Sequence, residues 1–295
     1  MAMSSCIFFF FLFSLAVGDS YSSICRSVCG NLTVAYPFGL RPGCGHRAFR
    51  DLLYCINDVL MLHIPSGSYR VLDIDYPYDA LVLHDPHISD CGSIVLGGRA
   101  NGFVVEPWRA DYLTPSPDNV FMLIACSTRS SSSSRNCSRV GGGGMVGCAG
   151  YYGCPAWDII RPKSSGYDDG SECCAVSNVK SVNLTELDCQ GYSSAYSVAP
   201  VRERRPENWS YGILVKYYYR SGGSDGDDPF FSCPACEATG GSCGYQAAGG
   251  NGVCLCGSRN STSDCDSAGS PQEFPLLKLT SRNKLKTQLV FLSRS

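Results

Sequence analysis

Nineteen cysteines in a chain of 295 residues restrict what this protein can fold into. The stretch CPACEATGGSCGYQAAGGNGVCLC (233–256) carries five of them in C-x-x-C and C-x-C spacings. In a reducing compartment such spacings indicate a zinc site or a redox-active thiol pair, whereas in an oxidising compartment they indicate structural disulfides. The compartment therefore decides how the cysteines are interpreted.

The N-terminus indicates that compartment. Residues 7–17 are apolar or small, a run shorter than the roughly 20 residues that cross a bilayer. Small residues at Ala16–Gly18 suit a signal peptidase, so we predict a signal peptide over residues 1–18. The alternative, a buried N-terminal helix, would place many consecutive phenylalanines in a soluble domain. We therefore expect a secreted, extracellular chain with no stable membrane span.

Secretion predicts that the cysteines form disulfides rather than metal or redox sites. Cys6 leaves with the signal peptide, and the others fall in three sets of six, so that each set could bridge within itself. Adjacent Cys173 and Cys174 are expected to bond elsewhere, because a bridge between neighbours is strained. The connectivity stays open, and we expect no metal and no cofactor. The three sets are Cys25, Cys29, Cys44, Cys55, Cys91 and Cys126; Cys137, Cys148, Cys154, Cys173, Cys174 and Cys189; and Cys233, Cys236, Cys243, Cys254, Cys256 and Cys265.

Five N-x-S/T sequons agree with an extracellular location, because each is an acceptor for N-glycosylation on an exposed surface. They are Asn31, Asn136, Asn183, Asn208 and Asn260. The formal net charge of −2 provides no global field for nucleic acid or anionic lipid. We therefore expect no nucleic-acid partner.

Short β-branched and aromatic runs separated by turn residues predict a mostly β, disulfide-rich fold. The runs are residues 32–39, 59–65, 69–77, 80–85, 102–108, 119–126 and 211–219. Within 69–77, alternation would place Val71, Asp73 and Asp75 on one face and Leu72, Ile74 and Tyr76 on the other. The sequence KYYYR (216–220) suits either a sheet core or a sugar-stacking surface.

Composition divides the chain into two small cysteine-rich β modules. The Ser/Gly-rich stretch at 128–147 reads as a flexible linker, between a first module at 19–127 and a second at 148–270. The last residues, 271–295, are basic and lack cysteine, so we expect a disordered tail.

Ordered motifs resemble a plant family. CGNLTVAYPFGLRPGCG (29–45), YRVLDIDYPYDALVLHDPHISDC (69–91) and DNVFMLIAC (118–126) are similar to the galacturonan-binding domain of wall-associated receptor kinases. NWSYGILVKYYY (208–219), followed by C-x-x-C, GGSCG and C-x-C, resembles the cysteine-rich C-terminal module of leaf-rust-resistance-type receptor-like kinases. Unlike those receptors, this sequence shows no transmembrane or kinase segment, so we expect a kinase-less relative.

The resemblance implies binding of cell-wall pectin, as homogalacturonan or oligogalacturonides, at the first module. Such a polyanion requires cations, preferably arginine, whose planar group grips carboxylates with two donors. Four basic residues lie within ten positions, with Phe38 and Phe49 nearby, and we take them as candidate ligand contacts: Arg41, His46, Arg47 and Arg50. Arg70, Arg99 and Arg109 are weaker candidates. Solvated surface arginines paired with aspartates are the alternative interpretation.

Other functions stay open. A calcium ion could bridge pectin to Asp73, Asp75 and Asp79, although these do not form a recognised calcium loop. In the HDPH sequence (84–87), His84 and His87 could bind a metal or act as a base, and acids such as those of DGDD (225–228) could pair in space for glycoside hydrolysis. A glycoside-active enzyme is therefore a less favoured alternative. No catalytic residues are predicted, because no nucleophile elbow or H-E-x-x-H motif occurs. A receptor ectodomain or a peptide is the alternative partner, which would make this chain a protein-interaction module.

Overall fold

A computed structural model of the chain describes Cys25 and residues 27–97, 102–126, 146–147, 151–160, 173–196, 205–219, 231–247, 249–257 and 259–267. It confirms a mostly β, disulfide-rich fold. The predicted signal peptide, Asn136, Arg99, the DGDD sequence and the tail at 271–295 lie outside the described residues. Within the described ranges no helix is both long and apolar enough to cross a membrane.

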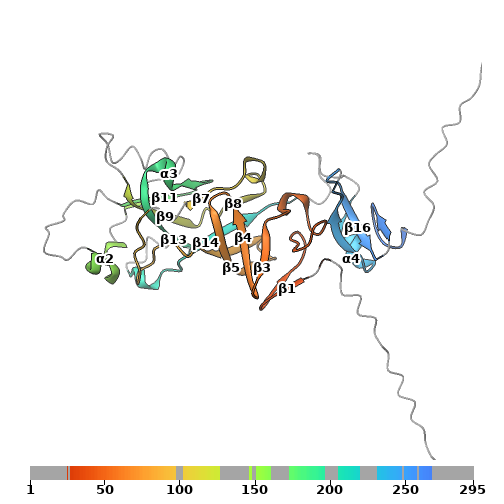
Figure 1. The fold of residues 1–295 in the computed structure, drawn as a ribbon, viewed down its shortest axis with the longest axis horizontal. Helices are drawn as coiled ribbons and strands as arrows, with labels where there is room; N and C mark the ends of the chain where they lie inside the picture. The colour runs from red at the N-terminus through yellow and green to blue at the C-terminus, as the bar shows by residue number, and fades with distance from the viewer. Residues whose placement is uncertain are drawn as a thin grey trace, which may run out of the picture.

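A six-stranded antiparallel sheet forms the centre of the molecule (Figure 1). Its strands pair in the order β3-β4-β5-β6-β14-β8. Their bounds are β3 (Leu53–Ile56), β4 (Val59–Ile64), β5 (Gly67–Asp75), β6 (Ala80–His84), β14 (Ile213–Tyr217) and β8 (Leu113–Pro115). Strand β14 lies between two strands from the first half of the chain, pairing Leu214 with Val82 and Lys216 with Thr114.

A second sheet has the order β10-β11-β9-β13. Its strands are β10 (Val146–Gly147), β11 (Cys173–Ser177), β9 (Asn119–Cys126) and β13 (Cys189–Tyr196). Strand β9 is flanked by a neighbour on each edge and buried on both faces, which explains its continuous apolar run.

Strand pairs cross the predicted boundary between the two modules. Strand β9 belongs to the predicted module 19–127, whereas its partners β11 and β13 belong to the predicted module 148–270. Strand β10 even uses the last two residues of the predicted linker 128–147. The low-complexity stretch marks a local change in composition, but composition does not specify which distant strands pair.

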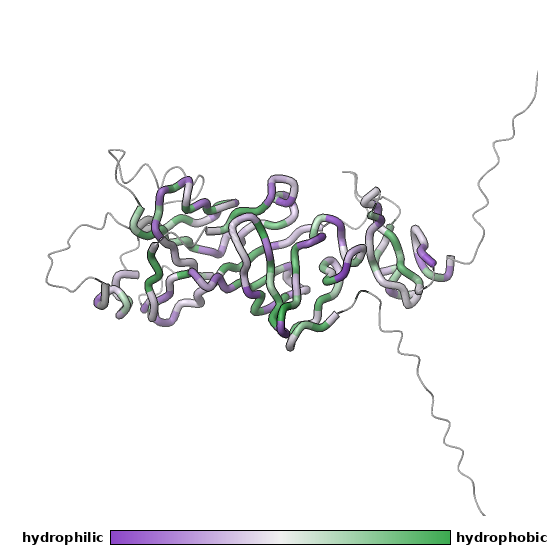
Figure 2. The backbone as a smooth tube through the Cα atoms, viewed as in Figure 1, coloured by the Kyte–Doolittle hydropathy of each residue, from purple (hydrophilic) through white to green (hydrophobic). Residues whose placement is uncertain are grey.

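The two sheets share one core. Along β9, Phe121 and Leu123 face the cluster that includes Leu62, Val71 and Val215 of the six-stranded sheet. The alternate residues Val120, Met122 and Ile124 face a second cluster with Tyr151, Trp157 and Trp209. Figure 2 shows hydrophobic stretches following these strands, alternating with polar ones. Period-two alternation thus buries both faces of one sheet and one face of the other.

The structure resolves part of the connectivity that the sequence left open, and two bridges cross between sets. Cys91 bonds Cys154 and Cys126 bonds Cys189, so both bridges join the first set to the second. Strand pairing decides this, because Cys126 and Cys189 are register partners at the ends of β9 and β13. The bridges Cys25–Cys44 and Cys29–Cys55 stay within the first set. Cys137 and Cys148 lie outside the described residues, as do the side chains of Cys173 and Cys174.

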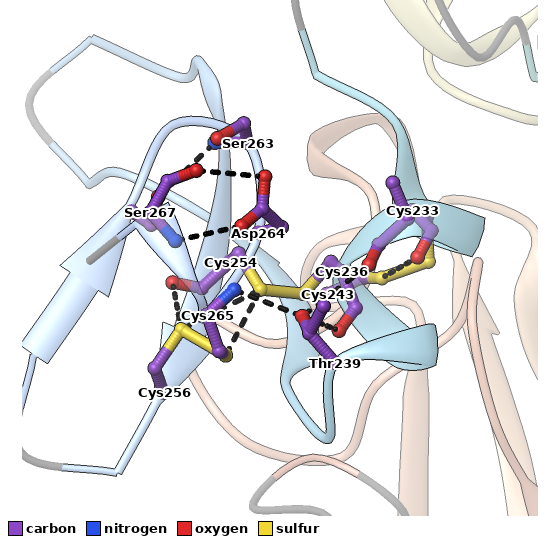
Figure 3. Close-up of a disulfide and its surroundings, with 12 residues drawn as sticks. Cys233, Cys236, Thr239, Cys243, Cys254, Cys256, Ser263, Asp264, Cys265 and Ser267 are labelled. Atoms are coloured by element: carbon purple, nitrogen blue, oxygen red, sulfur yellow. Dashed lines mark hydrogen bonds between the residues drawn. A yellow bond between two sulfur atoms is a disulfide. The ribbon is translucent and has the colours of Figure 1, made fainter. Parts of the chain in front are cut away.

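The third set bridges within itself and confirms the disulfide interpretation of residues 233–256. Helix α4 (Cys233–Ala238) packs on a sheet of β15 (Ser242–Tyr245), β16 (Gly252–Cys256) and β17 (Arg259–Ser261). The bridges are Cys233–Cys243, Cys236–Cys254 and Cys256–Cys265, and Figure 3 shows them close together. A Cβ at Gly241 would lie 2.4–2.7 Å from three of these sulfurs, so glycine is required there.

This cysteine-rich unit is anchored to the rest of the molecule by backbone pairing. The Gly45 N–H donates to the Cys243 carbonyl at 3.0 Å, and the Tyr245 N–H donates to the Gly43 carbonyl at 2.9 Å. A Cβ at Gly244 would lie 2.2 Å from the Gly43 oxygen. The Cys44-Gly45 pair and the GGSCG motif (240–244) therefore meet at one junction. This junction lies at the end of the molecule where β16 and α4 are beside the N-terminal strands (Figure 1).

A β-bulge in β5 changes the predicted alternation of residues 69–77. The register shifts between Val71 and Asp73, which turns Val71 and Ile74 into the core and leaves Leu72 and Asp73 exposed. The predicted set of Val71, Asp73 and Asp75 is therefore wrong, because one extra residue in a strand reverses the side-chain order beyond it.

Short elements make up the rest of the described residues' regular structure. Strands β1 (Ser27–Cys29) and β2 (Leu32–Val34) form a hairpin, and β7 (Gly102–Phe103) pairs with β12 (Val182–Asn183). The helices besides α4 are η1 (Arg47–Phe49), η2 (Pro107–Arg109), η3 (Tyr151–Gly153), α2 (Pro155–Ile160), α3 (Leu184–Leu187) and η4 (Pro206–Asn208).

Candidate functional site

The basic segment 41–50 folds around the short helix η1. His46 is the N-cap of this helix, and its Nδ1 accepts a hydrogen bond from the Ala48 N–H at 3.2 Å. The imidazole is half-buried and makes ring contacts with Tyr36, Phe49, Tyr112 and Tyr219. His46 therefore has a clear structural role at the start of η1.

A buried arginine joins η1 to η2. Arg109 is 1% exposed, and its Nη1 donates to both carboxylate oxygens of Glu106 at 2.8 and 2.7 Å. Its other donors reach the carbonyls of Ala48 at 3.3 Å and Arg50 at 2.8 Å. Burial lowers the pKa of Arg109, and the neighbouring Glu106 opposes that shift. Arg109 thus fixes the backbone on which Arg50 stands.

The side chain of Arg50 lies over Trp108. Its Cζ is 4.5 Å from the indole centroid, and the Cζ of Arg109 is 4.4 Å from it. The Trp108 side chain is 44% exposed, and Arg50 is exposed. The Arg50 Nη1 donates to the Arg47 carbonyl at 3.5 Å. Stacking engages the flat face of the guanidinium, which leaves its other in-plane N–H groups for a carboxylate. We call Arg50, Trp108 and Arg109 the Arg50–Trp108 platform.

The structure separates the other basic residues from this platform. Arg47 lies against the cysteine-rich unit, since a Cβ at Gly250 would be 2.9 Å from its Nη1 and 3.1 Å from its Cδ. Arg41 is exposed in the loop that reaches the junction, where its carbonyl accepts from the Cys44 N–H. The segment 41–50 therefore presents three arginines in different surroundings rather than one continuous patch.

Trp108 is absent from the contacts predicted from the sequence, in which Arg109 is a weaker candidate. The sequence EPWR (106–109) could have indicated Trp108, because a tryptophan next to an arginine can make a cation–π contact. Arg109 is a buried structural residue. Arg70 is exposed on β5.

The sequence KYYYR (216–220) was predicted to form either a sheet core or a sugar-stacking surface, and its tyrosines differ in burial. Tyr217 is 1% exposed and packs against Phe38 and Phe49, whereas Tyr218 is 51% exposed. Burial raises the pKa of Tyr217 well above its ordinary value. Alternation along β14 thus assigns Tyr217 to the core and leaves Tyr218 at the surface.

Asp85, Asp75 and the clustered cysteines, also considered for chemistry, have structural partners. Asp85 is buried and accepts hydrogen bonds from the Tyr192 hydroxyl at 2.5 Å and from the His87 N–H at 2.8 Å. Asp75 accepts from the Tyr78 N–H at the turn between β5 and β6. The sulfurs of Cys254, Cys256 and Cys265 lie close together, but all three belong to disulfides.

Four predicted glycosylation sites fall in described residues. Asn31, Asn208 and Asn260 are exposed, as the prediction requires. Asn183 is half-buried and caps helix α3, with its Oδ1 accepting from the Glu186 N–H. This bond uses the side-chain oxygen and leaves the amide nitrogen, which carries the glycan in a sequon.

Comparison with known proteins supports the predicted resemblance. Residues 25–85 match the family model described as wall-associated receptor kinase galacturonan-binding, which confirms the resemblance for that segment. The match includes Arg41, His46, Arg47 and Arg50 and ends before Trp108.

A relative extends the similarity along the chain. Wall-associated receptor kinase 4 from Arabidopsis thaliana is 25% identical over 264 residues, covering 86% of this chain. The chain spans 34% of the length of that relative. No solved structure matches the chain. The likeness to the C-terminal module of leaf-rust-resistance-type receptor-like kinases stays a prediction.

Proposed function

We propose that this chain is a non-catalytic, extracellular binding protein for homogalacturonan and its oligogalacturonide fragments. The observation that carries the proposal is the Arg50–Trp108 platform, which adjoins the segment matched by the galacturonan-binding family. Uronic-acid units supply one carboxylate each, which fits the two-pronged donor geometry of Arg50.

Preorganisation favours this site over an ordinary surface arginine. The indole of Trp108 limits the conformations of Arg50, and buried Arg109 holds the carbonyl of Arg50 at 2.8 Å. Less conformational entropy is therefore lost when a ligand binds, and this loss is a main cost of association. The same argument assigns Trp108 a positioning role.

Titration of the oxidised protein with size-defined oligogalacturonides tests the proposal. We expect binding that weakens as salt rises, because the contact is between charges, and no binding of fully methyl-esterified oligomers. Arg50→Glu should weaken binding by at least about tenfold, whereas Arg259→Glu, a charge reversal at an exposed arginine of β17, should not.

A conservative variant separates positioning from general damage. Trp108→Phe keeps an aromatic face for Arg50 and should bind better than Trp108→Ala. Equal binding by wild type, Arg50→Glu and Trp108→Ala would remove the platform from the proposal. Failure of the folded wild-type protein to bind any acidic oligomer would remove pectin, and a receptor ectodomain or peptide would become the leading partner.

A further inference from the structure

The outward face of the six-stranded sheet carries a second group of side chains that the platform does not use. Alternation along β4 and β5 buries Leu60, Leu62, Tyr69 and Val71 in the core. The residues between them point to the opposite face. We define the open sheet face as Tyr54, Met61, His63, Ser68, Arg70 and His84.

Strand register places four of these residues in one row. Tyr54 is the partner of Met61, Met61 of Arg70, and Arg70 of His84. Side chains of directly opposed residues lie on the same face, with Cβ atoms about 5 Å apart. The row therefore crosses four neighbouring strands, β3 to β6, and extends about 14 Å at the usual strand spacing.

A second pair adjoins this row. His63 is the partner of Ser68, and its Nδ1 lies 2.9 Å from the Ser68 Oγ. The ring centroids of His63 and Tyr54 are 6.4 Å apart in an edge-to-face arrangement. Tyr54 is 42% exposed, and His63, Ser68, Arg70 and His84 are exposed as well. These groups thus share one solvent-accessible surface.

The chemistry of this surface suits an acidic sugar chain. Arg70 offers paired donors to a carboxylate, the imidazoles and the Ser68 hydroxyl can hydrogen-bond sugar hydroxyls, and Tyr54 and Met61 provide apolar area. Beyond the β5 bulge, Asp73 is the acid exposed on this sheet. Within the row itself, Arg70 is the charged side chain and no carboxylate is present, so the row offers a cationic contact to an anion.

We propose that the open sheet face is a second binding surface for an acidic polysaccharide, separate from the Arg50–Trp108 platform. The inference rests on the proposed function for the identity of the ligand, but it depends on different residues. A row across four strands fits an extended polymer, because each neighbouring strand presents one side chain of the row, about 4.8 Å from the next.

Hydroxyl-radical footprinting read by mass spectrometry tests the two sites in one experiment. Tyr54, Met61 and Trp108 report directly, since aromatic and sulfur side chains react readily. With size-defined oligogalacturonides we expect protection of Tyr54 and Met61, while the exposed Tyr78 in the β5–β6 turn serves as an unprotected control. Tyr54→Ala and Arg70→Glu should each reduce affinity at this face by about tenfold and leave the protection of Trp108 unchanged.

The outcomes separate the two proposals. Protection of Trp108 without Tyr54 and Met61 would overturn the open sheet face and leave the platform intact. Protection of Tyr54 and Met61 without Trp108 would support this face and remove the platform. Protection at neither site would overturn both. Protection of Tyr54 that rises with protein concentration and needs no saccharide would assign the face to a second copy of this chain, which also overturns the proposal.

Discussion

Gly250→Ala is a direct test of the contact between Arg47 and the cysteine-rich unit. The new methyl group would lie 2.9 Å from the Arg47 Nη1 and 3.1 Å from its Cδ. Both atoms belong to a long, flexible side chain, so we expect Arg47 to move aside rather than the fold to break. The contact should therefore appear as coupling between residues 47 and 250.

Gly257 provides a matched control. Gly250 and Gly257 have left-handed φ values of +70° and +76°, but a Cβ at Gly257 would have no neighbour within 4 Å. Alanine at either position costs about 1–2 kcal/mol for its backbone conformation, partly offset by about 0.4–1 kcal/mol from a less flexible unfolded chain. Gly257→Ala should thus lose about 1 kcal/mol of unfolding free energy, and Gly250→Ala should lose more, because Arg47 must also move.

A double-mutant cycle in urea separates the contact from the shared backbone cost. In the cycle of Gly250→Ala with Arg47→Ala, we expect an interaction energy of about 0.5–1 kcal/mol, since the residues touch. The cycle of Gly257→Ala with Arg47→Ala should be additive within about 0.3–0.5 kcal/mol. Additivity in both cycles would refute the placement of Arg47 against Gly250.

Three further changes probe the scaffold. Arg109→Lys should destabilise the protein by about 3–5 kcal/mol in urea, because lysine cannot replace both the paired contact and the two carbonyl contacts; a loss below about 1 kcal/mol would contradict that role. Gly241→Ala should leave free thiols, detectable by alkylation and mass spectrometry, because a methyl group overlaps three sulfurs, whereas Gly240→Ala should not. Tyr192→Phe should cost about 1–3 kcal/mol of unfolding free energy by removing a donor to buried Asp85, and an unchanged urea midpoint would argue against this bond.

The candidate site was predictable in part. The clustered basic residues of segment 41–50 predicted ligand contacts there, and the family match covers the same residues. The partner of Arg50 was not predictable, because Trp108 lies 58 positions later in the sequence and reaches Arg50 through the packing of η2 on η1. The role of Arg109 depends on burial, which a charged residue type argues against.

Local chemistry in the sequence by itself determined the β class, most strand positions and the disulfide state of residues 233–265. Alternating apolar residues, turn residues and cysteine parity act over short distances, so they are visible without a structure. Tertiary structure alone decided that β14 inserts between β6 and β8, that Cys91 bonds Cys154, and that Arg50 stacks on Trp108. The physical reason is that these contacts join residues far apart in the chain, and their energies depend on the geometry of the whole core.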